Sequence, residues 1–70
     1  MKVKVTVILK SGVKQENEYI YNGISCRKEF EEKLKNNLEE NSNCICFKDN
    51  NSFDFYLKSE IAHMSIEYIN

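Results

Sequence analysis

The amino-acid sequence predicts one α+β domain, in which an antiparallel sheet carries a single helix on one face. Two extended segments with alternating apolar residues open the chain, an amphipathic segment follows, and three short extended segments close it. This order is β-β-α-β-β-β. The 70 residues include no proline and two glycines, and they contain no repeat or linker-like stretch. We therefore expect one domain over residues 1–70.

The first two strands are expected to form a hairpin, because alternate residues over 3–9 are apolar and a Ser-Gly turn follows. A two-residue loop would place glutamates opposite the valines. A three-residue loop over 10–12 instead pairs Val3 with Tyr19. It also puts Gly12 at the left-handed position that such loops need. We predict the three-residue loop, since a slip by one residue would turn every side chain to the opposite face.

A helix is predicted from Ser25, as its N-cap, to about Glu40. Apolar side chains recur along it at every fourth position and form one narrow stripe. The residues of this stripe are Cys26, Phe30, Leu34 and Leu38. A helix of this length matches a strand of eight residues, so it can cover one face of one sheet.

Three extended segments follow the helix, at 44–47, 53–57 and 61–69. Residues 49–52 have the composition of a turn, and a second break precedes Ile61. We expect the first two strands to lie on one side of the sheet and the last three to form a meander on the other.

Apolar residues occur on both faces of these last strands, although one helix can cover only one face. If Cys46, Phe55 and Met64 face the helix, a second apolar set faces away from it. That set consists of Ile45, Phe47, Tyr56 and Ile61, our candidates for contact with a protein partner or a second copy of the chain. The alternative is that the register differs, or that strand twist separates these side chains.

Basic residues are concentrated in the first hairpin, although the net charge of the whole chain is −1. The lysines concerned are Lys2, Lys4, Lys10 and Lys14. With nearby tyrosines they would form a basic, aromatic face, and nucleic-acid binding is therefore the alternative function. The pI of about 5.8 is low for such a protein, and the expected register turns the tyrosines away from Lys2 and Lys4. The other interpretation is that the lysines decorate the solvated face of an edge strand.

No group of residues predicts catalysis, a cofactor or a small-molecule substrate. The chain has one histidine, and both glycines lie in turns, so neither a catalytic triad nor a phosphate-binding loop is expected. A metal site would have to combine Cys26, Cys44, Cys46 and His63. Their spacing lacks the close ligand pair of a zinc knuckle, and cysteines that pack as small apolar residues are the simpler interpretation.

The chain is expected in the cytoplasm, without contact to a membrane. Its apolar runs are short, and the alternating N-terminal residues lack the apolar block of a signal peptide. The three cysteines are an odd number, which favours a reducing compartment over a set of disulfides.

The chain as a whole makes heavy use of Asn, Lys, Ile and Glu, and three of its segments carry a resemblance, namely the opening residues 1–12, the helical residues 29–34 and the residues 53–62. In these segments the chain resembles short uncharacterised proteins of low-GC Gram-positive bacteria and their prophages. The resemblance implies a small inhibitor or regulator that acts on a host protein by direct contact, and it carries over no functional residue. Together these observations predict a small non-enzymatic binding protein that acts by protein–protein contact or self-association.

Overall fold

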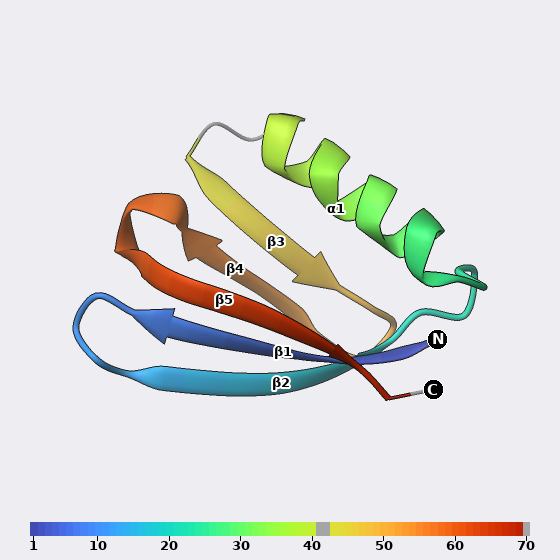
Figure 1. The fold of residues 1–70 in the computed structure, drawn as a ribbon, viewed down its shortest axis with the longest axis horizontal. Helices are drawn as coiled ribbons and strands as arrows, with labels where there is room; N and C mark the ends of the chain where they lie inside the picture. The colour runs from blue at the N-terminus through green and yellow to red at the C-terminus, as the bar shows by residue number, and fades with distance from the viewer. Residues whose placement is uncertain (41–42, 70) are drawn as a thin grey trace.

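The computed structural model describes residues 1–40 and 43–69, and their elements follow the expected order (Figure 1). The elements are β1 (Lys2–Leu9), β2 (Lys14–Ile20), α1 (Arg27–Glu40), β3 (Cys44–Lys48), β4 (Phe53–Leu57), the 3₁₀ turn η1 (Lys58–Glu60) and β5 (Ile61–Tyr68). The predicted α+β class and element order are confirmed.

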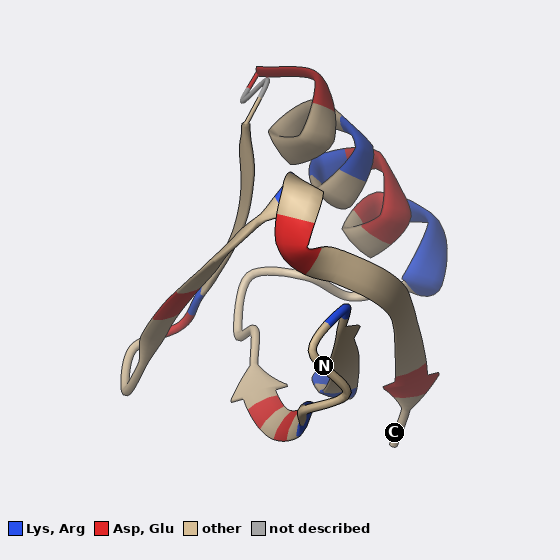
Figure 2. Cartoon of the chain, turned by 90° about the vertical axis from the view of Figure 1, so that its left-hand side faces the viewer, with Lys and Arg blue, Asp and Glu red and all other residues tan. Residues whose placement is uncertain are grey.

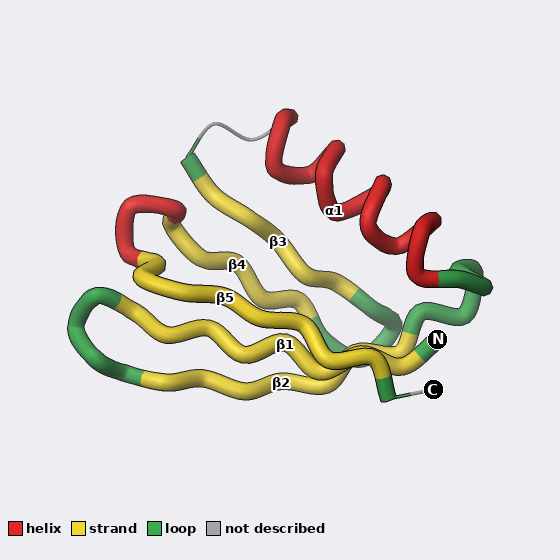
Figure 3. The backbone as a smooth tube through the Cα atoms, in the orientation of Figure 1, coloured by secondary structure: helices red, strands yellow, loops and turns green. Residues whose placement is uncertain are grey.

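The strands form two antiparallel sheets, with the orders β2-β1-β5 and β3-β4. The predicted meander of the last three strands is therefore wrong, because β5 pairs with β1 and not with β4. The turn η1 separates β4 from β5 in the chain (Figure 3). The Lys10 N–H donates to the Glu60 carbonyl at 2.8 Å, which ties the end of β1 to the start of β5.

The register predicted for the first hairpin is confirmed. Val3 lies opposite Tyr19, and the Leu9 N–H donates to the Val13 carbonyl at 2.8 Å. Gly12 has a φ of 93°, in the left-handed region that favours glycine. Turn chemistry and the alternation of the valines therefore specify this hairpin locally.

The core lies between the inner faces of the two sheets. Its buried strand residues are Val3, Val5, Val7, Tyr19, Ile45, Phe47 and Tyr56. The ring centroids of Tyr19 and Phe47 lie 5.5 Å apart. The sheets also meet through polar side chains, since the Tyr19 hydroxyl donates to Asp54 Oδ2 at 2.6 Å. Burial and this neighbouring carboxylate raise the pKa of Tyr19.

The helix α1 lies alongside β3 (Figure 1). The Asn37 amide pairs with the backbone of Cys46 as a neighbouring strand would, donating to its carbonyl at 2.9 Å and accepting its N–H at 3.3 Å. Near the start of the helix, the ring of Phe30 packs 5.4 Å from Tyr21 and 6.0 Å from Tyr68. The helix therefore joins the edge of β3 to the end of β5.

The predicted helical stripe is only partly used. Phe30 is buried and Leu34 is half-buried, but Leu38 and Cys26 are exposed. The helix begins at Arg27, so Ser25 lies one residue too early to be the N-cap. The Ser25 hydroxyl instead donates to Glu29 at 3.5 Å.

Candidate functional site

The inner face of the β3–β4 hairpin is formed by the residues that the sequence suggested for partner contact. Ile45, Phe47 and Tyr56 are buried, with exposed fractions of 0%, 2% and 9%, and Ile61 is half-buried against the core. The prediction that they form an exposed patch is wrong. Successive side chains of a strand point to opposite faces, so the alternation of residues separates two apolar sets. It does not show which of the two sets is buried in the core.

The outer face of the same hairpin carries the exposed apolar set. Phe53, Phe55 and Leu57 are exposed by 60%, 58% and 48%. The rings of Phe53 and Phe55 lie 6.4 Å apart. Across the ladder, Phe55 pairs with Cys46 and Leu57 pairs with Cys44. Apolar residues are therefore contiguous on this face, which we call the hairpin face (residues 44, 46, 53, 55 and 57).

Two half-buried cysteines, Cys44 and Cys46, lie on the hairpin face. Burial and the neighbouring Cys44 thiol raise the pKa of Cys46. A raised pKa disfavours the thiolate, which is the nucleophilic and metal-binding form of cysteine. The neutral Cys46 side chain therefore extends the apolar character of the hairpin face.

The backbone of β4 leaves one edge of this small sheet open. The Lys58 N–H donates to the Asn43 carbonyl at 2.8 Å, and hydrogen-bonded pairs alternate along an antiparallel ladder. Asp54 and Tyr56 therefore bond to β3. The backbone groups directed to the opposite edge belong to Phe53, Phe55 and Leu57. Within residues 1–40 and 43–69, no strand lies against that edge.

The edges of β2 and β3 are protected, and that of β5 is contacted at its end. Glu16 and Glu18 on the edge strand β2 form ion pairs with lysines, and Lys4 lies 3.6 Å from Glu16. The edge of β3 is occupied by the Asn37 amide. Beside the end of β5, the Tyr68 hydroxyl donates to Glu31 of α1 at 3.0 Å. Charged side chains and covering elements both prevent edge-to-edge pairing, so β4 differs from β2 and β3. The outer edge of β5 also lacks a paired strand within the described residues.

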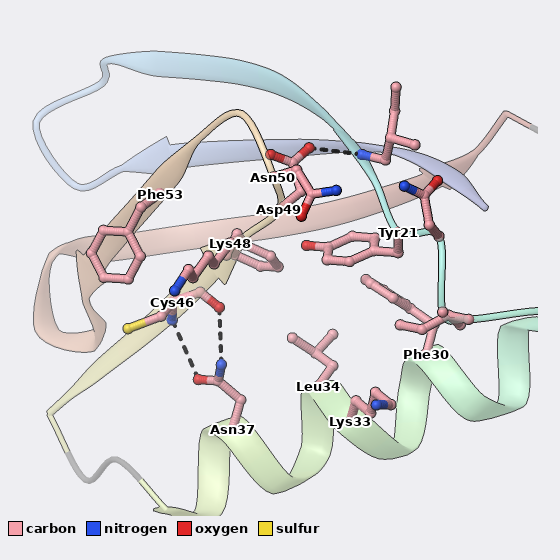
Figure 4. Close-up of a pocket in the computed structure, with 15 residues that line it drawn as sticks. Tyr21, Phe30, Lys33, Leu34, Asn37, Cys46, Lys48, Asp49, Asn50 and Phe53 are labelled. Carbon is pink, nitrogen blue, oxygen red and sulfur yellow. Dashed lines mark hydrogen bonds between the residues drawn. The ribbon is translucent and has the colours of Figure 1, made fainter.

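A pocket of about 650 Å³ adjoins the hairpin face, between α1, the end of β2 and the β3–β4 turn (Figure 4). Phe30 and Leu34 of the helix line it, and the ring of Tyr21 lies between the helix and the turn. Burial and the nearby Asp49 carboxylate raise the pKa of Tyr21 to about 12, so its hydroxyl stays neutral. Phe53 also lines the pocket, which makes the pocket continuous with the hairpin face.

Charged groups lie among the pocket-lining residues. The Asp49 carboxylate accepts the Ile20 N–H at 2.9 Å and the Ser52 N–H at 2.8 Å. These hydrogen bonds, first of all the one from Ile20, hold the pKa of Asp49 below its usual value. The carboxylate is thus satisfied within the protein and ties the β3–β4 turn to β2. Lys33 and Lys48 also line the pocket and give it positive charge.

The lysines of the first hairpin do not form a separate basic face. Lys2 pairs with Glu18, while Lys4 and Lys14 both pair with Glu16. Lys14 and Lys4 lower the pKa of Glu16. The tyrosines lie elsewhere, since Tyr19 is buried and Tyr21 lines the pocket beside α1. Lys10 lies in the turn, where its backbone N–H donates to the Glu60 carbonyl of η1. In Figure 2 the red bands of acidic residues on β2 show this mixing of charges.

The candidate metal ligands do not come together. Cys26 is exposed at the start of the helix, Cys44 and Cys46 lie on the hairpin face, and His63 is exposed on β5. Among the described residues, no group of three or more His, Cys, Asp or Glu side chains is placed to hold a metal ion. No helix in this part of the chain is long and apolar enough to cross a membrane.

Comparison with protein-family models, with curated proteins and with solved structures found no match to this chain. The candidate site therefore depends on the geometry of the chain itself. Sequence reasoning recognised that the hairpin is apolar on both faces, but it assigned Phe55 to the covered side. Only the elements of the same chain that pack against the hairpin distinguish its two faces.

Proposed function

We propose that this chain is a small non-enzymatic binding protein that acts by protein–protein contact through the hairpin face. One observation carries the proposal. Phe53, Phe55 and Leu57 expose about half or more of their surfaces side by side, on a strand whose outer edge is open. At these fractions, three side chains of this size expose on the order of 300 Å². Apolar patches of this extent on a small domain commonly mark contact sites.

Burial of this patch would supply useful binding free energy. At about 25 cal/mol per Å², about 300 Å² of apolar surface is worth on the order of 7 kcal/mol before the entropic cost of association. Aromatic residues that lie at the centre of such a surface are typical anchors of protein interfaces. Phe55 is central in the exposed set, so we expect it to contribute most.

The adjoining pocket supports the same function. Phe53 belongs to both surfaces, so a partner seated on the hairpin face can also insert an apolar side chain beside Phe30 and Leu34. Lys33 and Lys48 line this pocket and favour a partner whose contact surface carries acidic groups.

The remaining parts of the proposal come from the sequence. A cytoplasmic setting agrees with the odd number of cysteines. An inhibitor or regulator of a host protein agrees with the resemblance to prophage proteins and needs no catalytic group. Nucleic-acid binding is not favoured, because Lys2, Lys4 and Lys14 are paired with glutamates.

The experiment that tests this function compares three tagged proteins in a capture assay from cells of the source organism. They are the natural chain, Phe55→Lys and Val13→Lys. Val13 is 49% exposed, similar to Phe55 at 58%, but it lies in the first hairpin. The two variants therefore add the same charge at different apolar sites, and circular dichroism checks that each is folded.

The proposal expects a protein that the natural chain and Val13→Lys retain in comparable amounts and that Phe55→Lys loses. A partner retained equally by all three proteins would show that contact occurs elsewhere on the chain. If no protein is captured and the chain also does not associate with itself, the function is not protein binding through this face.

A further inference from the structure

We propose that the partner at the hairpin face is a second copy of this chain, bound by antiparallel pairing of the two β4 strands about Phe55. This inference rests on the proposed function and names the partner for the same surface. The result would be a symmetric dimer in which the two-fold axis passes beside Phe55, and the small sheet of each copy becomes half of a four-stranded sheet.

The backbone of β4 is complementary to itself. Its outward N–H and C=O groups belong to Phe53, Phe55 and Leu57, as the register with β3 requires. In antiparallel pairing about Phe55, Phe55 lies opposite the same residue of the second copy, and Phe53 lies opposite Leu57. Every outward group of the strand then meets a donor or acceptor. A two-fold interface of this kind uses one patch twice and closes on itself.

The side chains agree with this pairing. On the outer face the pairs would be Phe55 with Phe55 and Phe53 with Leu57, and such aromatic and aliphatic cross-strand pairs stabilise antiparallel sheets. On the other face Asp54 would lie opposite Tyr56, so no like charges are opposed. Asp54 already accepts the Tyr19 hydroxyl at 2.6 Å within its own copy. Its charge therefore does not have to be satisfied by the partner.

A second copy also explains why the edge of β4 lacks the protection that the edges of β2 and β3 have. The edge of β2 carries charged side chains, that of β3 is bonded to Asn37, and β5 ends beside α1. A two-stranded sheet is marginal by itself, and further strands stabilise it. Pairing of two β4 strands would give both small sheets the additional strands that they lack.

The size of the surface sets the expected affinity. Two copies would bury on the order of 600 Å² of exposed apolar side chain, which is little more than a third of the roughly 1,600 Å² that a standard stable interface buries. We therefore expect a reversible dimer with a dissociation constant between about 10 µM and 1 mM, and not an obligate one.

The oligomeric state is tested by sedimentation equilibrium of the purified chain from about 10 µM to 2 mM, a range chosen from this affinity. The proposal expects the dimeric fraction to rise with concentration and to exceed one half at the high end. Phe55→Lys should remain monomeric throughout, because a lysine on an edge strand prevents pairing. Val13→Lys should associate like the natural chain. A natural chain that stays monomeric at every concentration, or Phe55→Lys that dimerises normally, overturns the proposal.

Hydrogen exchange of the natural chain tests the register and needs no variant. The amides of Asp54 and Tyr56 bond to β3 and should be protected at any concentration. The amides of Phe53, Phe55 and Leu57 should exchange quickly in dilute solution and slow at least about twofold at the high concentration, as they become paired. A dimer that leaves these amides unprotected contradicts pairing through β4.

The outcomes separate this inference from the function on which it rests. If the chain is monomeric but Phe55→Lys loses a captured protein, contact through the hairpin face stands and its partner is another protein. If the dimer forms as described, both proposals stand.

Discussion

The two edge strands β2 and β4 differ in how they meet solvent. Each has one hydrogen-bonded neighbour, β1 for β2 and β3 for β4. β2 exposes a charged surface in which Glu16 and Glu18 pair with lysines, whereas β4 exposes Phe53 and Phe55. In Figure 2 the β3–β4 hairpin is mostly tan, and β2 carries bands of charge. An edge protected by charge has a structural role, while an apolar edge left open indicates a surface used for contact.

The same two strands are also linked on their inner sides. Tyr19 of β2 donates to Asp54 of β4, and the Asn17 amide donates to the Tyr56 hydroxyl at 3.2 Å. β4 is therefore held to the larger sheet by side chains, and its backbone edge stays available. The comparison of β2 with β4 thus distinguishes a buried face, an inter-sheet link and an open edge. The following variants test the buried face and the link, and then the protected edge of β3 and the end of β2.

The largest effect is expected from the inner face of the hairpin. Ile45→Ala removes a fully buried side chain and should lower the free energy of unfolding by about 2–5 kcal/mol, because a cavity remains. Phe55→Ala, in dilute solution, should change it by no more than about 0.5 kcal/mol, because Phe55 is exposed. Urea denaturation followed by circular dichroism measures both. Losses of equal size would contradict the assignment of the two faces.

The link between β2 and β4 should have the next largest effect. Tyr19→Phe removes the donor to the Asp54 carboxylate and should cost about 1.5–3 kcal/mol, as expected for a hydrogen bond to a charged group. Tyr21→Phe is the control, since the Tyr21 hydroxyl donates no hydrogen bond within the described part of the chain. A double-mutant cycle with Asp54→Asn isolates the pair. Additive losses in that cycle would argue against a direct link.

The protected edge of β3 should contribute less. Asn37→Ala removes two hydrogen bonds to the Cys46 backbone and should cost about 1–2 kcal/mol in urea denaturation. Asn36→Ala is the matched control, because Asn36 lies on the exposed side of the same helix. If both variants lose the same stability, helix propensity and not the edge contact is responsible.

The smallest effect is expected at alkaline pH, where the end of β2 meets the β3–β4 turn. Burial raises the pKa of Tyr21 from 10.0 to about 12 in the folded chain. The stability gained from the protonated hydroxyl is fully present below pH 10 and is lost as the pH rises through about 12. Because Tyr21 is only half-buried, the effect should be modest. In urea denaturation from pH 9 to 12, the free energy of unfolding should fall less steeply with pH for Tyr21→Phe than for the natural chain. An equal fall for both proteins would contradict this prediction.

Several features could be predicted from the sequence because they depend on local interactions. The alternating valines, the turn at Gly12 and the pairing of Val3 with Tyr19 follow from strand period and loop geometry, and all are found. The helix was predicted to within one residue of its start. The pairing of β5 with β1 was missed, since contacts between distant segments leave no local pattern in the chain.

The candidate site shows even more clearly that local sequence patterns do not predict contacts between distant segments. In β3 the bulkier residues are Ile45 and Phe47, but in β4 the more apolar set is Phe53, Phe55 and Leu57, and the register makes these two sets face opposite ways. Each strand taken alone thus favours a different buried face. No pattern within the hairpin resolves this conflict.

The sequence by itself determined the fold class, the order of the elements and the register of the first hairpin, because strand and helix periods and turn residues act over short distances. Only the tertiary structure decided which face of β3–β4 is buried. The Tyr19 hydroxyl, brought from β2, satisfies Asp54 and allows its face to turn inward. Since a strand cannot bury one set without exposing the other, Phe53, Phe55 and Leu57 are left outside.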